Sequence, residues 1–139
     1  SISDILNTLA AKHVLVVADS CYAGKLSQAA VPRVDVEMSP EAQQEWIRIM
    51  AKARARTALT SGGVQPVLDN GGGGHSIFAG AFLESLAHQD GVIDGYSLYR
   101  EVLGKVRTRA KALNQQQIPE YAPLRYAGHE AGEFFFQAQ

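Results

Sequence analysis

Val14-Leu-Val-Val-Ala18 runs directly into Asp19-Ser-Cys-Tyr-Ala-Gly24, and this stretch decides the fold that the sequence predicts. The first segment is apolar at every position and contains three β-branched valines, which is typical of a strand covered on both faces in a parallel sheet. Gly24 permits a sharp chain reversal just beyond the carboxyl end of that strand. Because ligands bind at this end of the strands in open α/β sheets, the turn is a candidate functional site.

The composition of the whole chain is that of a globular protein without strong net charge. Its 139 residues are 46% hydrophobic and 19% charged, which fits one soluble domain. Thirteen Lys and Arg against fourteen Asp and Glu argue against a cationic surface for nucleic acid or anionic lipid. The apolar runs are far shorter than the roughly 20 residues that span a bilayer, and no signal sequence opens the chain. We therefore expect a cytoplasmic protein with no nucleic-acid and no membrane partner.

Helical and strand-like patterns alternate along the rest of the chain. Capping residues and apolar residues at helical spacing mark the helices, and runs of β-branched or aromatic residues mark the strands. The expected elements are a helix over 2–10 capped by Ser1 or Ser3, a strand over 14–18, a helix from Pro40 to roughly Ala55, a strand over 56–60, helices capped by Ser76 and Ser97, and a closing strand over 133–137. Because a strand buried on both faces needs a neighbour on each side, we expect a further strand upstream of Ser1.

Cys21 is the one cysteine of the chain and lies in the turn after the first strand. A single cysteine makes no internal disulfide and fills no structural zinc site by itself, so Cys21 is either a small packed side chain or a reactive thiol. The turn projects the thiol at the edge of the sheet, where backbone amides can stabilise an oxyanion. The glycine run over 71–74 is not followed by Gly-Lys-Ser or Gly-Lys-Thr, which disfavours a nucleotide-binding loop.

Ala18-Asp-Ser-Cys-Tyr-Ala-Gly24 resembles the nucleophile segment of the caspase-like cysteine peptidases, closest to the metacaspase and prokaryotic caspase-homologue branch. Further segments resemble successive landmarks of prokaryotic caspase-like domains, in the same order and over nearly the whole chain. These segments are Arg54-Ala-Arg-Thr-Ala-Leu-Thr-Ser-Gly-Gly63, Pro66-Val-Leu-Asp69, Gly74-His-Ser-Ile-Phe78, Pro119-Glu-Tyr121 and Gly128-His-Glu-Ala-Gly-Glu-Phe-Phe-Phe136.

The resemblance implies a three-layer α/β/α caspase-like fold with a mixed, mostly parallel sheet. Residues 1–139 would form the carboxyl-terminal half of one such domain. Within it, residues 14–24 correspond to the nucleophile segment, residues 25–55 to a linker and residues 56–139 to a small-subunit-like part. The linker is basic and exposed in this interpretation, and self-cleavage is expected near Arg33.

The same resemblance implies a cysteine endopeptidase that cleaves protein or peptide substrates after Arg or Lys. Cys21 corresponds to the nucleophile. Asp19 matches a position that lines the pocket for the residue before the cut bond, where a carboxylate favours a basic side chain through a charge-assisted hydrogen bond. Ser61 and Gly62 match the strand end that pairs with the extended substrate. No cofactor or metal ligand is assigned, although some metacaspases depend on calcium, whose acidic ligands would fall mostly outside this chain.

The general base is the point at which the chain departs from the family pattern. Such enzymes need a His-Gly unit at the end of the preceding strand, which belongs upstream of the helix that starts near Ser3. The resemblance therefore implies the upstream half of the same domain, as a separate or cleaved chain, as a partner. His75 is the histidine of this chain that could replace the missing base. His13 is interpreted as a strand-entry residue, His88 as a helix-end cation and His129 as a turn residue.

Two other functions remain open from the residues alone. A caspase-like module that binds partners without catalysis would have lost its histidine. A redox-sensing thiol would have a low pKa at Cys21 and no peptidase activity. Asp19 has a local alternative too, since an aspartate in a turn often accepts hydrogen bonds from nearby amides.

Overall fold

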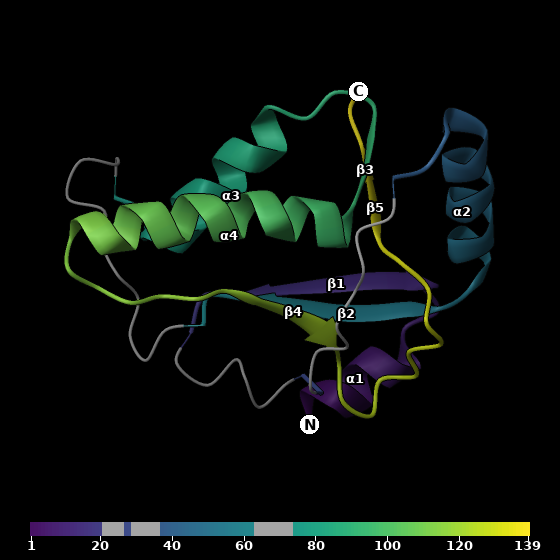
Figure 1. The fold of residues 1–139 in the computed structure, drawn as a ribbon. Coiled ribbons are helices and arrows are strands. Elements are labelled where there is room, and N and C mark those ends of the chain that lie inside the picture. The colour runs from purple at the N-terminus through teal and green to yellow at the C-terminus, as the bar shows by residue number, and fades with distance from the viewer. Residues whose placement is uncertain (21–26, 29–36, 63–73) are drawn as a thin grey trace.

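The computed structural model describes residues 1–20, 27–28, 37–62 and 74–139 of the chain. Within these ranges the protein is α/β, with a three-stranded mixed sheet and a separate two-stranded sheet (Figure 1). Cys21, Gly24, the segment around Arg33 and residues 66–69 lie outside the described residues. None of the described helices has the length and apolar character needed to cross a membrane.

Nine elements follow one another in the described chain. They are α1 (Ile2–Thr8), β1 (His13–Ala18), α2 (Pro40–Lys52), β2 (Ala55–Thr60), α3 (Ile77–Ala87), β3 (Val92–Asp94), α4 (Gly95–Ala112), β4 (Glu120–Pro123) and β5 (Phe135–Gln137). α2 ends at Lys52, earlier than the sequence predicts, because Ala55 already belongs to β2. The expected α/β class with a mixed sheet is confirmed, and parallel pairing among the described strands is confined to β1 and β2.

β2 is the central strand of the sheet, whose order is β1-β2-β4 (Figure 1). It pairs in parallel with β1, from His13 beside Ala55 to Ala18 beside Thr60, and antiparallel with β4. Every residue of β2 is buried, whereas β1 is only half-buried. Within the described sheet, residues 14–18 have a strand neighbour on one side only, and β2 is the strand that is paired along both edges. The expected burial of residues 14–18 on both sides therefore stays a prediction that depends on the further strand expected upstream of Ser1.

Helices lie on both faces of this sheet (Figure 1). α3 and α4 cover one face and form the larger core with Leu59 and Tyr121 of the strands. α1 lies on the opposite face, where Leu6 packs with Val16 against a smaller buried cluster. On α4 the apolar residues that recur every four positions are buried at Leu98, Val102, Val106 and Ala110, while Leu113 at the C-cap is exposed.

Two of the strands are absent from the sequence-based prediction, and a third has an unexpected partner. β4 contains Pro123 and follows Pro119, a pattern that favours a loop, but it pairs with buried β2 as an edge strand, where proline is tolerated. β5 is the expected closing strand, yet it pairs with β3 in a sheet of its own. The ring of Phe135 in β5 meets Trp46 of α2 edge-on at 5.7 Å between centroids, which ties α2 to this second sheet.

The N-caps of α1 and α3 are the serines that the sequence predicts, Ser1 and Ser76. Ser39 caps α2. The sequence predicts Ser97 as the cap of α4, but the helix begins at Gly95 with Asp94 as its N-cap. The Asp94 carboxylate accepts from the N–H of Ser97 at 3.0 Å and from its hydroxyl at 2.6 Å. The carboxylate thus offers two acceptors where a serine at the cap would offer one oxygen.

Arg56 projects from β2 toward α1 and is fully buried. Its guanidinium donates to the carbonyl oxygens of Leu6, Leu9 and Ala11, the last two at 3.0 and 2.5 Å. These carbonyls lie at and just beyond the end of α1, where helix carbonyls lack partners of their own, so Arg56 caps the helix. Burial lowers the pKa of the guanidinium, and the charge of Arg54 lowers it further, but a guanidinium stays protonated at neutral pH.

Replacing Arg56 with methionine should lower the free energy of unfolding by roughly 3 kcal/mol, because three carbonyl oxygens lose a charged donor. Arg56→Lys keeps the charge but lacks the planar fork, so we expect about half of that loss. Urea unfolding measures both changes. Arg48→Met on exposed α2 is the matched control and should change stability by less than about 0.5 kcal/mol. An Arg56→Met protein as stable as the wild type would show that these hydrogen bonds do not hold α1.

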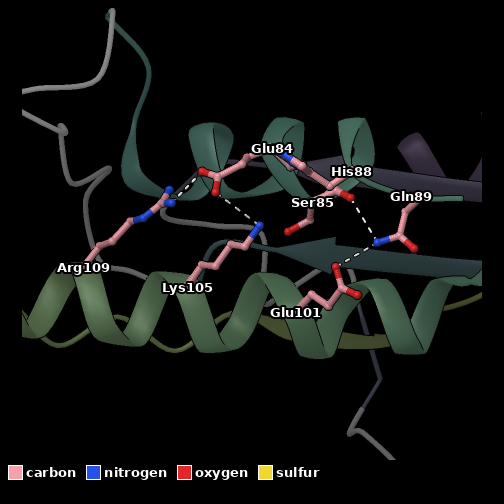
Figure 2. A network of polar contacts seen from close by, with 7 residues as sticks. All are labelled: Glu84, Ser85, His88, Gln89, Glu101, Lys105 and Arg109. Carbon is pink, nitrogen blue, oxygen red and sulfur yellow. Dashed lines mark hydrogen bonds and ion pairs between the residues drawn. The ribbon is translucent and has the colours of Figure 1, made fainter.

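Polar side chains join α3 to α4 along the surface (Figure 2). Glu84 of α3 forms ion pairs with Arg109 at 2.5 Å and with Lys105 at 3.4 Å. Farther along, the Gln89 amide donates to Glu101 of α4 at 2.8 Å. The basic residues of α4 predict a face exposed to solvent. The contacts of Lys105 and Arg109 with α3 could not be predicted from that pattern, because they depend on how the two helices pack. The hydrogen bond from Arg109 holds the pKa of the Glu84 carboxyl below its usual value.

Glu84 gives stability a pH dependence of definite sign. Because its folded-state pKa lies below the unfolded value of about 4.3, its contribution is fully present above that value and is lost as the pH falls through the folded pKa. Glu84→Gln should therefore lower the Tm at neutral pH, and the difference should shrink below about pH 4. Thermal unfolding from neutral to acidic pH checks this, and added salt should weaken the effect because the pairs are partly exposed. A difference that stays constant with pH would contradict the assignment.

Candidate active site at the ends of β1 and β2

Asp19 is the first residue beyond β1 and lies half-buried at the carboxyl end of the strand. Its Oδ2 accepts a hydrogen bond from the hydroxyl of Ser76. Ser76 is also the N-cap of α3, where its Oγ accepts from the N–H of Ala79 at 2.9 Å. The start of α3 therefore fixes the Asp19 carboxylate in place. The sequence predicts Ser76 as a cap but does not show its contact with the candidate site.

Ser61 is the corresponding residue beyond β2 and is buried. Its N–H donates to the carbonyl oxygen of Ala18 at 3.1 Å. This hydrogen bond continues the pairing of β1 and β2 by one residue beyond the end of β2. Because Ala18 and Thr60 are register partners, Asp19 and Ser61 occupy neighbouring positions at the same edge of the sheet. The structure thus brings together two of the residues that the sequence singles out.

Gly62 follows Ser61 with a φ of +67°, in the left-handed region that favours glycine. A methyl group on its Cα would overlap the backbone carbonyl of Ile118. The segment before β4 therefore passes directly against the end of β2. Gly62 has a structural reason to be glycine, in addition to the role in substrate pairing that the resemblance implies.

Gln117 belongs to this site, although no sequence motif marks it. It is only 2% exposed, and its Nε2 donates to the carbonyl oxygen of Ser61 at 3.1 Å. The residue lies in Gln115-Gln-Gln-Ile-Pro119, a polar run with neither helical nor strand periodicity. No pattern in that run marks one glutamine as buried and its neighbours as exposed.

Buried polar atoms without a hydrogen-bond partner gather at this end of the sheet. Among the described residues there are five such side-chain atoms, and three of them are Asp19 Oδ1, Thr60 Oγ1 and Gln117 Oε1. Asp19 lies on the same face as Leu15, which belongs to the core under α3 and α4, whereas Thr60 lies on the same face as Ala58, on the side of α1. Because buried polar groups are nearly always paired, the free oxygen of Asp19 indicates a place that another group completes. A carboxylate oxygen can only accept, so a partner rich in donors fits it best.

Three of the four histidines form hydrogen bonds with backbone atoms, and His13 and His88 lie at the strand start and the helix end where the sequence predicts them. His13 contacts a carbonyl oxygen at 3.1 Å at the start of β1, and His88 contacts one at 2.7 Å at the end of α3. His129 accepts at Nδ1 from a backbone N–H of β2 at 3.0 Å. His75 is exposed and directly precedes Ser76, the cap of α3. Of the four, His75 is therefore the one placed next to the residue that holds the Asp19 carboxylate.

Cys21 lies two positions after Asp19, outside the described residues, so its role as nucleophile stays a prediction. The parts of the chain that the structure describes contain no group of three or more His, Cys, Asp or Glu residues able to hold a metal ion. Comparisons of the chain with protein-family models, with curated proteins and with solved structures find no match. The interpretation of the site therefore depends on the motifs and on the geometry given above.

Three glycines provide a graded test of the close approach at the end of β2. Gly104→Ala, in open space on α4, should raise the free energy of unfolding by up to about 1 kcal/mol. Gly74→Ala meets no neighbouring atom but has a φ of +86°, so it should lower stability by about 1 kcal/mol. Gly62→Ala combines a positive φ with the overlap on Ile118 and should lower it by roughly 3 kcal/mol. Urea unfolding measures all three, and equal losses at Gly62 and Gly74 would show that the two backbones separate freely.

Proposed function

We propose that this chain is the carboxyl-terminal half of a caspase-like cysteine peptidase domain that cleaves after Arg or Lys, with Cys21 as the nucleophile. The ordered motifs that resemble the metacaspase and prokaryotic caspase-homologue branch support the family. The observation that carries the proposal is Asp19 Oδ1, which is buried and without a partner among the described residues, two positions before Cys21. A three-layer α/β/α architecture of the whole domain agrees with helices on both faces of the sheet (Figure 1).

Asp19 selects the basic side chain of the substrate in this proposal. An ammonium or guanidinium group donates to Oδ1 in a charge-assisted hydrogen bond, while Oδ2 stays on Ser76. An acidic side chain in the same pocket would place two carboxylates together, which is unfavourable. Ser61 and Gly62 line the end of β2, along which an extended substrate lies in this proposal.

The proposed reaction divides peptide hydrolysis into two steps. The Cys21 thiolate forms a bond to the carbonyl carbon, the C–N bond breaks, and the amine leaves with a proton returned by the general base. Water then gives a proton to the same base and attacks the thioester carbonyl. The C–S bond breaks, so the carboxylic acid is released and Cys21 is regenerated.

A histidine outside this chain supplies the general base in this proposal, and the upstream half of the domain carries it. The free edge of β1 supports such a partner, because β1 has one strand neighbour in the described sheet and is almost wholly apolar. Apolar edge strands are normally covered in native proteins. α1 also exposes Ile2, Ile5 and Leu9 along one helical face, which a neighbouring segment would cover.

Covalent labelling followed by intact-mass measurement tests the proposal. The protein is the full-length product that contains this chain and its upstream sequence, and the probe is a peptidyl acyloxymethyl ketone with Arg next to the reactive carbon. We expect one adduct on the wild type and none on Cys21→Ala. The same probe with Asp in place of Arg should leave the protein unlabelled.

Two variants test the individual roles. Asp19→Asn keeps the side-chain shape and removes the charge, so the Arg probe should label it at least about tenfold more slowly. His75→Ala should label at the wild-type rate, because the base lies elsewhere in this proposal. Labelling lost in His75→Ala would move the base into this chain. Absence of any Cys21-dependent adduct would favour the second interpretation, a caspase-like module that binds partners without catalysis.

A further inference from the structure

We propose that Gln117 is a positioning residue of this site, which holds the Ser61 carbonyl and so fixes the end of β2 against which an extended substrate lies. The inference rests on the peptidase function proposed above. It adds a residue that neither the resemblance nor the sequence pattern singles out. Gln117 acts through Ser61 and does not touch the reacting atoms.

Both backbone polar groups of Ser61 are engaged, although regular strand pairing has ended. The N–H donates to the carbonyl oxygen of Ala18 at 3.1 Å, and the C=O accepts from Gln117 Nε2 at 3.1 Å. In a continuing parallel ladder, the donor to this carbonyl would come from the neighbouring strand. β1 ends at Ala18, and the amide of Gln117 supplies a donor there.

The segment that carries Gln117 is itself fixed against β2. Glu120 pairs with Thr60 in the antiparallel ladder, and the Ile118 carbonyl lies so close to Gly62 that a larger residue does not fit. The Gln117 side chain is buried between these contacts. Its amide therefore has a set position relative to Ser61 and is not a mobile surface group.

The other amide atom of Gln117 argues against a role in packing alone. Oε1 is buried and has no hydrogen-bond partner in the part of the chain that the structure describes. An unsatisfied buried acceptor lowers stability, whereas an apolar side chain of the same size would not. The two preceding residues, Gln115 and Gln116, are exposed and avoid this penalty. A role in the site therefore explains a buried glutamine at this position better than a contribution to stability does.

Substrate length is the property that separates a positioning role from general structural damage. A peptide with several residues before the cut bond lies along the end of β2 and depends on the position of Ser61 and Gly62. A substrate with a single Arg reaches the Asp19 pocket without that contact. Loss of the Gln117 donor should therefore penalise the longer substrate selectively.

Steady-state kinetics on the full-length protein that contains this chain test the inference. The two substrates are a tetrapeptide amide and a single-residue amide, both with Arg at the cleaved bond. Gln117→Met removes the donor and keeps the volume, so the KM for the tetrapeptide should rise about tenfold with kcat unchanged within about twofold. Both constants for the single-residue substrate should stay within about twofold of the wild type. Gln116→Met, at the exposed neighbour, should leave both substrates unaffected.

Equal losses on the two substrates, or no loss on either, overturn the positioning role. If thermal unfolding shows that Gln117→Met does not fold, Gln117→Asn gives the same comparison, because its amide is one methylene too short to reach Ser61. A wild-type protein that hydrolyses neither substrate overturns the proposed function and this inference with it. An active wild type whose Gln117 variants show no dependence on substrate length overturns this inference alone.

Discussion

Arg56 makes the interaction on which the rest of the fold depends, because it fixes β2 in the middle of the molecule. Its guanidinium fills the C-terminal end of α1, and its backbone N–H donates to His129. A slip of β2 by one residue would send this cation to the face covered by α3 and α4, where an apolar core lies. A slip by two residues would keep the face but carry the guanidinium along the strand, away from the carbonyls of Leu9 and Ala11. The observed register of β2 against β1 is therefore the one that satisfies Arg56. This register places Asp19 beside Ser61 and so sets the geometry of the candidate site.

Elements with a strong apolar period could be predicted from the sequence, whereas elements that exist through a partner could not. The row Leu98, Val102 and Val106 has the spacing of one helical face, and α4 buries it. β3 and β4 are only three and four residues long, and each is a strand because another strand pairs with it. The cap of α4 shows the same limit on a smaller scale. Both Asp94 and Ser97 are good caps, and the pairing of β3 decides where the helix begins.

The candidate site also contains residues that the sequence predicts and one residue that only the tertiary structure brings there. Asp19 and Ser61 each follow a strand that the sequence predicts, and parallel pairing brings the ends of those strands together. Gln117 lies 56 positions from Ser61 and approaches it through the antiparallel pairing of β4. Such a neighbour is a product of tertiary structure, because nothing local distinguishes Gln117 from the glutamines before it. The role of Cys21 as nucleophile and the source of the base remain predictions, supported by the motif and by the edge of β1 that has no strand neighbour in the described sheet.

The hydroxyl of Ser76 serves two partners at once, since it accepts from the N–H of Ala79 and donates to Asp19. A ligand that draws the carboxylate toward itself therefore weakens the first turn of α3, while a ligand that leaves Oδ2 in place preserves it. Reciprocity requires that any condition that frays this turn change the affinity for the ligand by the same factor. Ligand binding at the end of β1 and local unfolding of the first turn of α3 are thus thermodynamically coupled.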